Sequence, residues 1–179
     1  LEETARMSLG RALVCRGRLR IIDTVTGYEK RSTSGNRLLT ITPLEAPPQV
    51  FETEGLWFVI PDNIRAEMED NFMHFMGGIH ALEHAAIGLL PLLIMADRND
   101  FGGISTPLHP QTGLSGVFIY DGLPGGAGLT RQAFPDARGL LEATLKAVAA
   151  CPCEDGCPSC VHSPKCGSGN RPISKIGAL

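Results

Sequence analysis

The sequence of 179 residues lacks the segments that direct a chain into a membrane or out of the cell. Residues 1–10 are polar and amphipathic, unlike the basic start and apolar run of a secretory signal peptide. The most apolar stretch, residues 85–96, is shorter than the roughly 20 residues that span a bilayer. We therefore expect a soluble, cytoplasmic protein with no membrane partner.

Three further absences limit the fold and the function. No internal repeat is evident, and no Gly-x-x-x-x-Gly-Lys-Ser/Thr phosphate loop occurs anywhere in the chain. The chain also has no Asp-Glu motor box, so alone it is not expected to be an ATPase. Its composition, 43% hydrophobic and 20% charged, is that of a globular protein and excludes a disordered or fibrous one.

The formal net charge of -3 hides an uneven distribution of charge. Residues 1–50 carry 8 Lys and Arg against 5 Asp and Glu, whereas residues 51–150 carry 5 against 12. Arg16, Arg18 and Arg20 form the densest basic cluster. Their alternation fits an exposed strand face, and it would also suit neutralisation of phosphates on a polyanion.

The pattern of apolar residues predicts an α+β fold with an α/β-like core. Residues 1–60 are expected to form an antiparallel sheet or partial barrel, with strands at residues 13–25, 36–42 and 50–60. Residues 61–150 are expected to hold buried helices and a short sheet, and residues 151–179 a cysteine-rich, zinc-stapled coil. These three ranges are the predicted domains.

Within the middle part, a helix is expected to start near Pro61, to be interrupted at Gly77-Gly78, and to continue as a buried helix over residues 79–95. Pro91 is expected to kink or restart it. Residues 97–116 are expected to form a loop. The apolar strand at residues 117–120, followed by a glycine loop and a helix that ends near Ala150, is typical of half an α/β unit.

Five of the six cysteines fall between Cys151 and Cys166, which is the strongest signal in the chain. The Cys157-Pro-Ser-Cys160 spacing lets two thiolates meet one tetrahedral zinc ion, and Cys151 with Cys153 supplies a second pair. We predict a structural Zn²⁺ site formed by Cys151, Cys153, Cys157 and Cys160. Cys166 and His162 are alternative ligands. Because this segment has almost no large apolar residues, the metal is expected to supply most of its folding energy, about 10 to 16 kcal/mol in isolated zinc modules.

Three other interpretations of the cysteines are less favoured. Disulfides would strain between cysteines this close in sequence, and an odd cluster cannot pair fully. A redox Cys-x-x-Cys motif belongs at the start of a helix in a thioredoxin-like context, whereas this pair lies in a segment rich in Pro and Gly. An iron–sulfur cluster is also compatible with four thiolates, and the colour of the protein would identify it.

The segment His80-Ala-Leu-Glu83-His84 matches the His-x-x-Glu-His arrangement of inverted zinc peptidases. A metallohydrolase using His80, Glu83 and His84 is therefore an alternative function. The favoured interpretation is a structural hydrogen-bond network, because short motifs often match by chance. Its expected partners are a nearby loop and the carboxylates of Asp97, Asp100 and Asp121. The glycine loop at residues 122–128 is interpreted as a tight turn instead of a phosphate site, because it has no Lys or Arg.

Taken together, these motifs resemble one known family over nearly the whole chain. The segments that carry the resemblance are Gly27-Tyr28, Phe51 to Trp57, Gly78 to Ala85, Asp97 to Ser105, Tyr120 to Leu129, and Cys151 to Cys160. The order of these segments is similar to the zinc-binding C-terminal region of MrfA-type (YprA-like) superfamily 2 DNA repair helicases.

The resemblance implies a noncatalytic accessory domain of an enzyme that hydrolyses ATP and translocates along DNA from 3′ to 5′. It implies contact with the motor domains of the parent chain and with DNA, which we expect to be single-stranded. An accessory domain of a phage-defence protein is an alternative. The candidate DNA contacts are basic residues near the two ends of the chain: Arg16, Arg18, Arg20, Lys165, Arg171 and Lys175.

Overall fold

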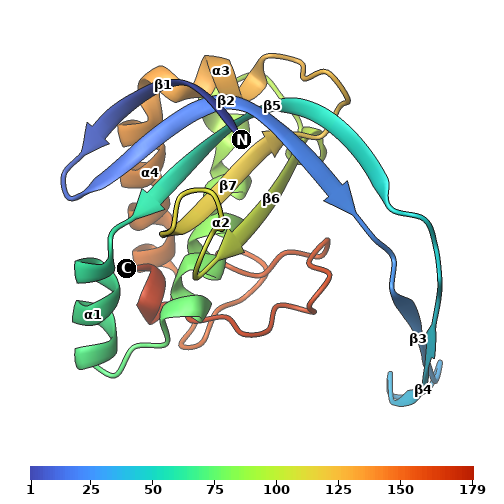
Figure 1. The fold of residues 1–179 in the computed structure, drawn as a ribbon. Helices are drawn as coiled ribbons and strands as arrows, with labels where there is room; N and C mark the ends of the chain where they lie inside the picture. The colour runs from blue at the N-terminus through green and yellow to red at the C-terminus, as the bar shows by residue number, and fades with distance from the viewer.

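The computed structural model describes residues 1–179, and its main feature is a five-stranded antiparallel sheet (Figure 1). In spatial order the strands are β1 (Glu2–Leu9), β2 (Ala12–Asp23), β5 (Gln49–Ile60), β7 (Ser115–Asp121) and β6 (Phe101–Thr106). Strands from the first sixty residues and from the middle of the chain thus share one sheet. The division into domains at residues 60 and 150 stays a prediction.

Strands β2 and β5 are long, and they continue beyond the rest of the sheet. They pair from Leu13 with Val59 to Asp23 with Gln49. After this last pair, β3 (Gly27–Arg31) and β4 (Leu38–Pro43) form a separate two-stranded hairpin. Figure 1 shows this hairpin projecting away from the body of the molecule. We call residues 24–48 the arm.

The helices lie mainly on one face of the curved sheet (Figure 1). They are α1 (Asp62–Asp70), α2 (Phe75–Leu93), α3 (Leu129–Ala133) and α4 (Ala137–Ala150), with the short 3-10 helices η1 (Arg98–Asp100), η2 (Phe134–Asp136) and η3 (Ile176–Ala178). Helix α2 contacts β6 and β7 on one side and α4 and η3 on others. It is therefore the element around which the helical layer and the C-terminal tail assemble.

The core is built on the alternation of side chains along β5. Leu56 and Phe58 point to the helices and pack in the main cluster with residues such as Leu90 of α2. Trp57 points to the opposite face, where its ring stacks on that of Phe118 with 6.1 Å between centroids. Because β5 is buried on both faces, its C-terminal half appears in the sequence as a continuous apolar run.

Helix α2 is the buried central helix that the sequence predicts. By length and composition it would also pass as a membrane span, but 61% of its most apolar window is buried inside the protein, as in the core helix of a globular domain. Pro91 lies in its last turn, and the helix ends two residues later at Leu93.

The expected interruption at Gly77-Gly78 is wrong. The break between α1 and α2 lies at residues 71–74, and the two glycines belong to the first turns of α2. Their role is close packing, because a Cβ atom on Gly78 would lie 2.4 Å from the carbonyl oxygen of Gly177. The Ser174 amide also donates a hydrogen bond of 3.0 Å to the Gly77 carbonyl oxygen. The C-terminal tail thus rests directly on the helix backbone.

Two other local predictions are wrong, because the segments concerned belong to the antiparallel sheet. Residues 97–116 are not a continuous loop, because they contain η1 and the edge strand β6. The apolar strand at residues 117–120 is part of β7, which pairs antiparallel with both neighbours and is not half of a parallel α/β unit. A strand buried on both faces gives the same apolar run in either kind of sheet. The α+β fold class with an N-terminal antiparallel sheet is confirmed.

Candidate metal centre and nucleic-acid interface

Four cysteine sulfurs converge after the end of α4. The Sγ atoms of Cys151, Cys153, Cys157 and Cys160 all lie within 4.8 Å of one another. The Sγ of Cys151 is 3.6 Å from that of Cys153 and 3.5 Å from that of Cys157, and the Sγ of Cys160 is 3.5 Å from Cys153 and 3.8 Å from Cys157. Neither Cys166 nor His162 belongs to this group. We call these four residues the tetracysteine cluster.

These separations fit one tetrahedral zinc ion. With Zn–S bonds near 2.3 Å, the edges of a tetrahedron of sulfurs are about 3.8 Å long. A disulfide bond of about 2.05 Å is absent, and the cysteines are free. The space between the sulfurs has room for a single ion and is too small for a cage of several iron and sulfide atoms. A zinc ion held here would have all four positions filled by protein, which is the structural type of site.

Local backbone geometry brings the sulfurs together. Cys151 caps the C-terminus of α4, so the first proposed ligand is fixed to a helix that is anchored in the core on one face. The carbonyl oxygen of Cys157 accepts hydrogen bonds from the amides of Cys160, Val161 and His162, at 3.0, 3.2 and 3.1 Å. This turn places Cys160 beside Cys157. Gly156 precedes it with a φ of +113°, a conformation that favours glycine.

The cysteine-rich tail also has an apolar anchor, Val161. Its side chain is fully buried against Ala81 and Ala85 of α2 and Val148 of α4. A Cβ atom on Gly156 would lie 2.5 Å from a methyl group of Val161, so the glycine is required for this packing as well. Packing of Val161 on the helices therefore adds to whatever stability the metal supplies.

Lys175 lies behind the tetracysteine cluster. It is only 8% exposed, and its Nζ donates hydrogen bonds to the carbonyl oxygens of Cys151, at 2.6 Å, and Cys153, at 2.5 Å. Four thiolates around Zn²⁺ carry a net charge of -2, so a buried ammonium group next to the ligand loop compensates it. The sequence suggested Lys175 as a DNA contact, but in the structure its side chain is buried and its ammonium group points to the cluster instead of to the solvent.

The thiols differ in acidity according to their surroundings. A hydrogen bond from the Ser159 backbone, together with the Cys151 thiol, lowers the pKa of Cys157 to about 7, whereas burial raises the pKa of Cys160 to about 12. Of these two thiols, Cys157 is therefore the more readily deprotonated. Cys15 lies apart in the core, and burial raises its pKa to about 11.

The histidines of the His-Glu-His segment bind the C-terminal tail. The Nδ1 atom of His80 lies 2.7 Å from the carbonyl oxygen of Pro172, and that of His84 lies 2.8 Å from the carbonyl oxygen of Val161. Burial lowers the pKa of His84 to about 4 and raises the pKa of Glu83. The predicted hydrogen bonds to a nearby segment are confirmed.

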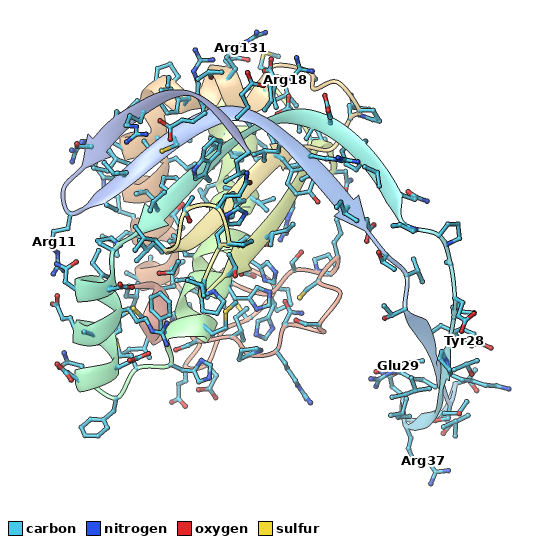
Figure 2. All side chains as sticks on the ribbon, viewed as in Figure 1. Arg11, Arg18, Tyr28, Glu29, Arg37 and Arg131 are labelled. Atoms are coloured by element: carbon cyan, nitrogen blue, oxygen red, sulfur yellow. The ribbon has the colours of Figure 1, made fainter.

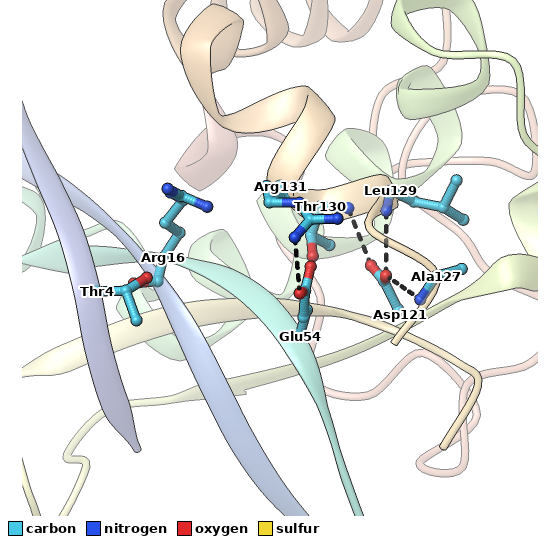
Figure 3. A network of polar contacts seen from close by, with 8 residues as sticks. All are labelled: Thr4, Arg16, Glu54, Asp121, Ala127, Leu129, Thr130 and Arg131. Atoms are coloured by element: carbon cyan, nitrogen blue, oxygen red, sulfur yellow. Dashed lines mark hydrogen bonds and ion pairs between the residues drawn. The ribbon is translucent and has the colours of Figure 1, made fainter. Parts of the chain in front are cut away.

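The predicted aspartate partners of this network are wrong. Asp97 and Asp100 instead form a capping box at η1, where the Asp97 carboxylate accepts from the Asn99 amide at 2.7 Å. Asp121 is fully buried and accepts hydrogen bonds from three amides of the glycine loop and α3, as Figure 3 shows. These donors are Ala127 at 2.8 Å, Leu129 at 3.1 Å and Thr130 at 2.9 Å. The glycine loop is therefore a tight turn around an internal carboxylate, as predicted.

The basic residues of β2 alternate along the strand on the same face as Val14, which packs in the helix-facing cluster. Arg18 is labelled in Figure 2 and Arg16 in Figure 3. Arg16 places its guanidinium 5.6 Å from the ring centroid of Phe134, and Arg18 is 61% exposed and forms an ion pair with Glu52 at 3.3 Å. Arg20 is exposed. A cleft of about 330 Å³ without hydrophobic lining contains Arg16 and Arg18.

The sequence reasoning missed Arg131, which lines the same cleft from α3. It forms an ion pair of 3.4 Å with Glu54 and is 61% exposed, and Figure 2 shows it beside Arg18. No local motif marks this arginine, because only the packing of α3 over β2 and β5 brings it there. Lys165 and Arg171 lie elsewhere, at a cavity next to His80. The basic residues thus form two separate groups.

A family model described as the MrfA Zn-binding domain matches residues 82–161, which include His84 and all four residues of the tetracysteine cluster. The chain is 34% identical over 120 residues to the uncharacterized ATP-dependent helicase YprA of Bacillus subtilis and 28% identical over 155 residues to the ATP-dependent helicase HRQ1 of Saccharomyces cerevisiae. These matches cover 66% and 79% of this chain but only 16% and 14% of the helicases.

A much shorter relative matches over nearly its entire length. The uncharacterized protein MJ1572.1 of Methanocaldococcus jannaschii is 36% identical over 104 residues, which are 56% of this chain and 93% of that protein. Among solved structures, the DUF1998 helicase MrfA bound to DNA matches with a TM-score of 0.65 and 26% identity over 100% of this chain and 23% of its own. The predicted resemblance is confirmed: the chain belongs to the MrfA Zn-binding domain family.

Proposed function

We propose that the chain is the noncatalytic, zinc-stabilised accessory domain of an ATP-dependent DNA helicase that acts in DNA repair. The convergence of four cysteine sulfurs within 4.8 Å, in a chain related to helicases over a small part of their length, carries this proposal. In it, Cys151, Cys153, Cys157 and Cys160 hold a structural Zn²⁺. The parent enzyme would translocate from 3′ to 5′ in the cytoplasm.

The chain supplies architecture in this proposal, and the motor supplies the chemistry. The sequence contains neither a phosphate-binding lysine loop nor an Asp-Glu motor box, so ATP hydrolysis belongs to other domains of the parent. A four-sulfur zinc site has no open position for a substrate. It instead fixes the tail against α2 and α4, which gives the domain a rigid surface to pack beside the motor domains.

DNA contact is the second part of the proposal. The cleft of Arg16, Arg18 and Arg131 offers guanidinium groups without apolar lining, which suits the phosphates of a single strand. Arg20 extends this group along β2, and Lys165 and Arg171 form a second one. Lys175 is left out because its ammonium group is buried.

Metal analysis of the full chain tests the zinc part. We expect Cys157→Ser to lose the ion of the tetracysteine cluster and to loosen residues 151–179, while the sheet retains its circular dichroism signal. Cys15→Ala is the matched control, because Cys15 lies in the core away from the cluster. Zinc content unchanged in Cys157→Ser, or iron in place of zinc, would contradict the proposal.

Fluorescence anisotropy with a single-stranded oligonucleotide tests the DNA part. We expect Arg16→Ala and Arg131→Ala each to weaken binding and to reduce the slope of log affinity against log salt by about 0.7. Arg11→Ala is the control, because Arg11 pairs with Glu67 of α1 and lies far from the cleft in Figure 2. Binding that is absent, independent of salt, or equally affected by all three variants would rule out this interface.

A further inference from the structure

A second group of metal-binding side chains lies apart from the tetracysteine cluster. It consists of His80 and His84 of α2 and Cys166 of the tail, whose ligand atoms lie within 4.8 Å of one another. The Nε2 of His80 is 3.4 Å from the Sγ of Cys166. The two imidazole rings are neighbours, with 4.3 Å between their centroids. The fold thus brings Cys166 next to His80 and His84, which lie far from it in the sequence.

The hydrogen bonds of the histidines prepare them to bind a metal. The Nδ1 atom of each ring faces a carbonyl oxygen, Pro172 for His80 and Val161 for His84. A carbonyl can only accept a hydrogen bond, so both Nδ1 atoms carry hydrogen and both Nε2 atoms of the neutral rings carry a lone pair. This is the usual arrangement of zinc-bound histidines, whose outer nitrogen donates to a carbonyl or carboxylate.

Polar groups of the tail hold the Cys166 sulfur in place. The Sγ accepts a hydrogen bond of 3.2 Å from the Asn170 amide and lies 3.2 Å from the Ser168 hydroxyl. These contacts fix the sulfur beside the Nε2 atom of His80. Without a metal, the thiol of Cys166 has one proton and can donate a hydrogen bond to only one of the two Nε2 atoms. A hydrogen-bond network therefore explains the convergence of all three atoms less completely than a shared ion does.

The three side chains leave room for a fourth ligand. They line a cavity of about 510 Å³ that also contains Glu83, from the same turn of α2. Glu83 is 6% exposed. A zinc ion held by three protein ligands keeps a position for water or another small ligand, unlike the closed tetracysteine cluster. The cavity supplies the space that such a ligand needs.

We propose that His80, His84 and Cys166 form a second zinc site, with an open fourth coordination position facing this cavity. The nitrogen and sulfur donors suit Zn²⁺ and disfavour Mg²⁺ or Ca²⁺, which bind oxygen. This site does not depend on the proposed helicase function. It assigns a binding role to Cys166, which the sequence suggested only as a substitute in the first cluster.

The number of zinc ions per chain tests this proposal without any variant. Inductively coupled plasma mass spectrometry of the full chain, purified without chelators, should give two zinc ions per chain. One zinc ion per chain in the wild type would overturn the proposal of two occupied sites. Because this count needs no substitution, it remains decisive even if a variant fails to fold.

Variants then assign the second ion. We expect Cys166→Ser and His84→Ala to retain one zinc ion, and Cys157→Ser to retain the other. The matched controls, Cys15→Ala and His109→Ala, remove a cysteine and a histidine outside both groups and should retain two. Two ions retained in both Cys166→Ser and His84→Ala would overturn the assignment.

Cobalt substitution gives a second readout. With Co²⁺ in place of zinc, the wild type should show thiolate-to-cobalt charge-transfer absorption from five sulfurs, and the difference spectrum against Cys166→Ser should correspond to one sulfur. In Cys157→Ser, the remaining cobalt spectrum should show a site with one sulfur ligand. A difference spectrum without charge-transfer absorption would show that Cys166 binds no metal.

Discussion

At the scale of residues, the zinc site depends on a lysine as well as on cysteines. The Lys175 ammonium group joins the carbonyl oxygens of Cys151 and Cys153, so it fixes the loop that carries two of the four proposed ligands. Outer groups that orient ligands typically change metal affinity by about 10- to 100-fold when they are removed. Lys175 also balances the negative charge of four thiolates.

We therefore expect Lys175→Met to lower zinc affinity by about tenfold. Methionine has a similar length but cannot donate, so both carbonyl oxygens lose their partner and the charge of the cluster is no longer compensated. Competition with a chromophoric chelator measures the change. Lys30→Met is the control, because Lys30 is an exposed lysine of β3 in the arm, outside both groups of candidate metal ligands. Equal affinities of the two variants would contradict the role given to Lys175.

Sequence spacing could predict the four cysteines because their loop is local. Cys157 and Cys160 are held together by a turn of a few residues, and the sequence itself contains the glycines and prolines of that turn. The grouping of Cys166 with His80 and the position of Lys175 depend on how the tail crosses α2. No spacing rule contains that information, so the sequence placed Lys175 on the surface.

At the scale of elements, α2 positions both candidate metal sites. Val161 of the tail packs against Ala81 and Ala85. His80 and His84 each form a hydrogen bond to a backbone carbonyl oxygen of the tail. Gly77 and Gly78 allow the tail backbone to contact the helix backbone. The tail has few large apolar side chains of its own. Its contacts with small and polar residues of α2 therefore anchor it to the body of the protein.

Two glycine substitutions in α2 separate helix propensity from tail packing. Gly88→Ala should raise the free energy of unfolding by about 0.5 to 1 kcal/mol, because nothing lies within 4 Å of the added Cβ and alanine favours the helix. Gly78→Ala should lower it by about 1 to 3 kcal/mol, because its Cβ would lie 2.4 Å from the Gly177 carbonyl oxygen. Urea unfolding measures both. The same sign for both variants would show that the tail does not require this glycine.

The elements could be predicted from the sequence where periodicity is strong. The strands at residues 13–25 and 50–60 and the buried helix are observed close to their predicted bounds. Strand β6 was missed because two of its first three residues are glycines, which weaken any strand signal. Gly103 packs against Ile87 and Glu83 of α2, so those glycines serve a contact that only the assembled fold reveals.

At the scale of the whole molecule, the arm contrasts with the compact body. It exposes several large apolar side chains, among them Val25, Tyr28, Leu39 and Ile41, at between 49% and 62%. None of the three hydrophobic clusters includes a residue from 24 to 48. Figure 2 shows Tyr28, Glu29 and Arg37 at the end of the arm, away from the body. The arm therefore contributes little to the stability of the core.

Removal of the arm should leave both the sheet and the zinc content intact. Asp23 and Gln49 form the last pair of β2 and β5, so an Asn-Gly turn can join them in place of residues 24–48. Because no core residue is lost, we expect the thermal midpoint to change by only a few degrees, with less aggregation once the exposed apolar surface is gone. Calorimetry and metal analysis measure these properties.

Shortening the loop at residues 107–113 is the matched comparison for the arm. Its His109 ring lies 4.7 Å, between centroids, from that of Phe118, so this loop covers the sheet face that holds Trp57. We expect its loss to lower stability by more than removal of the longer arm does, since exposure of buried aromatic surface costs about 25 cal/mol per Å². If removal of the arm instead unfolds the sheet or releases zinc, the long β2–β5 pair depends on the hairpin at its end, and the arm is part of the folding unit.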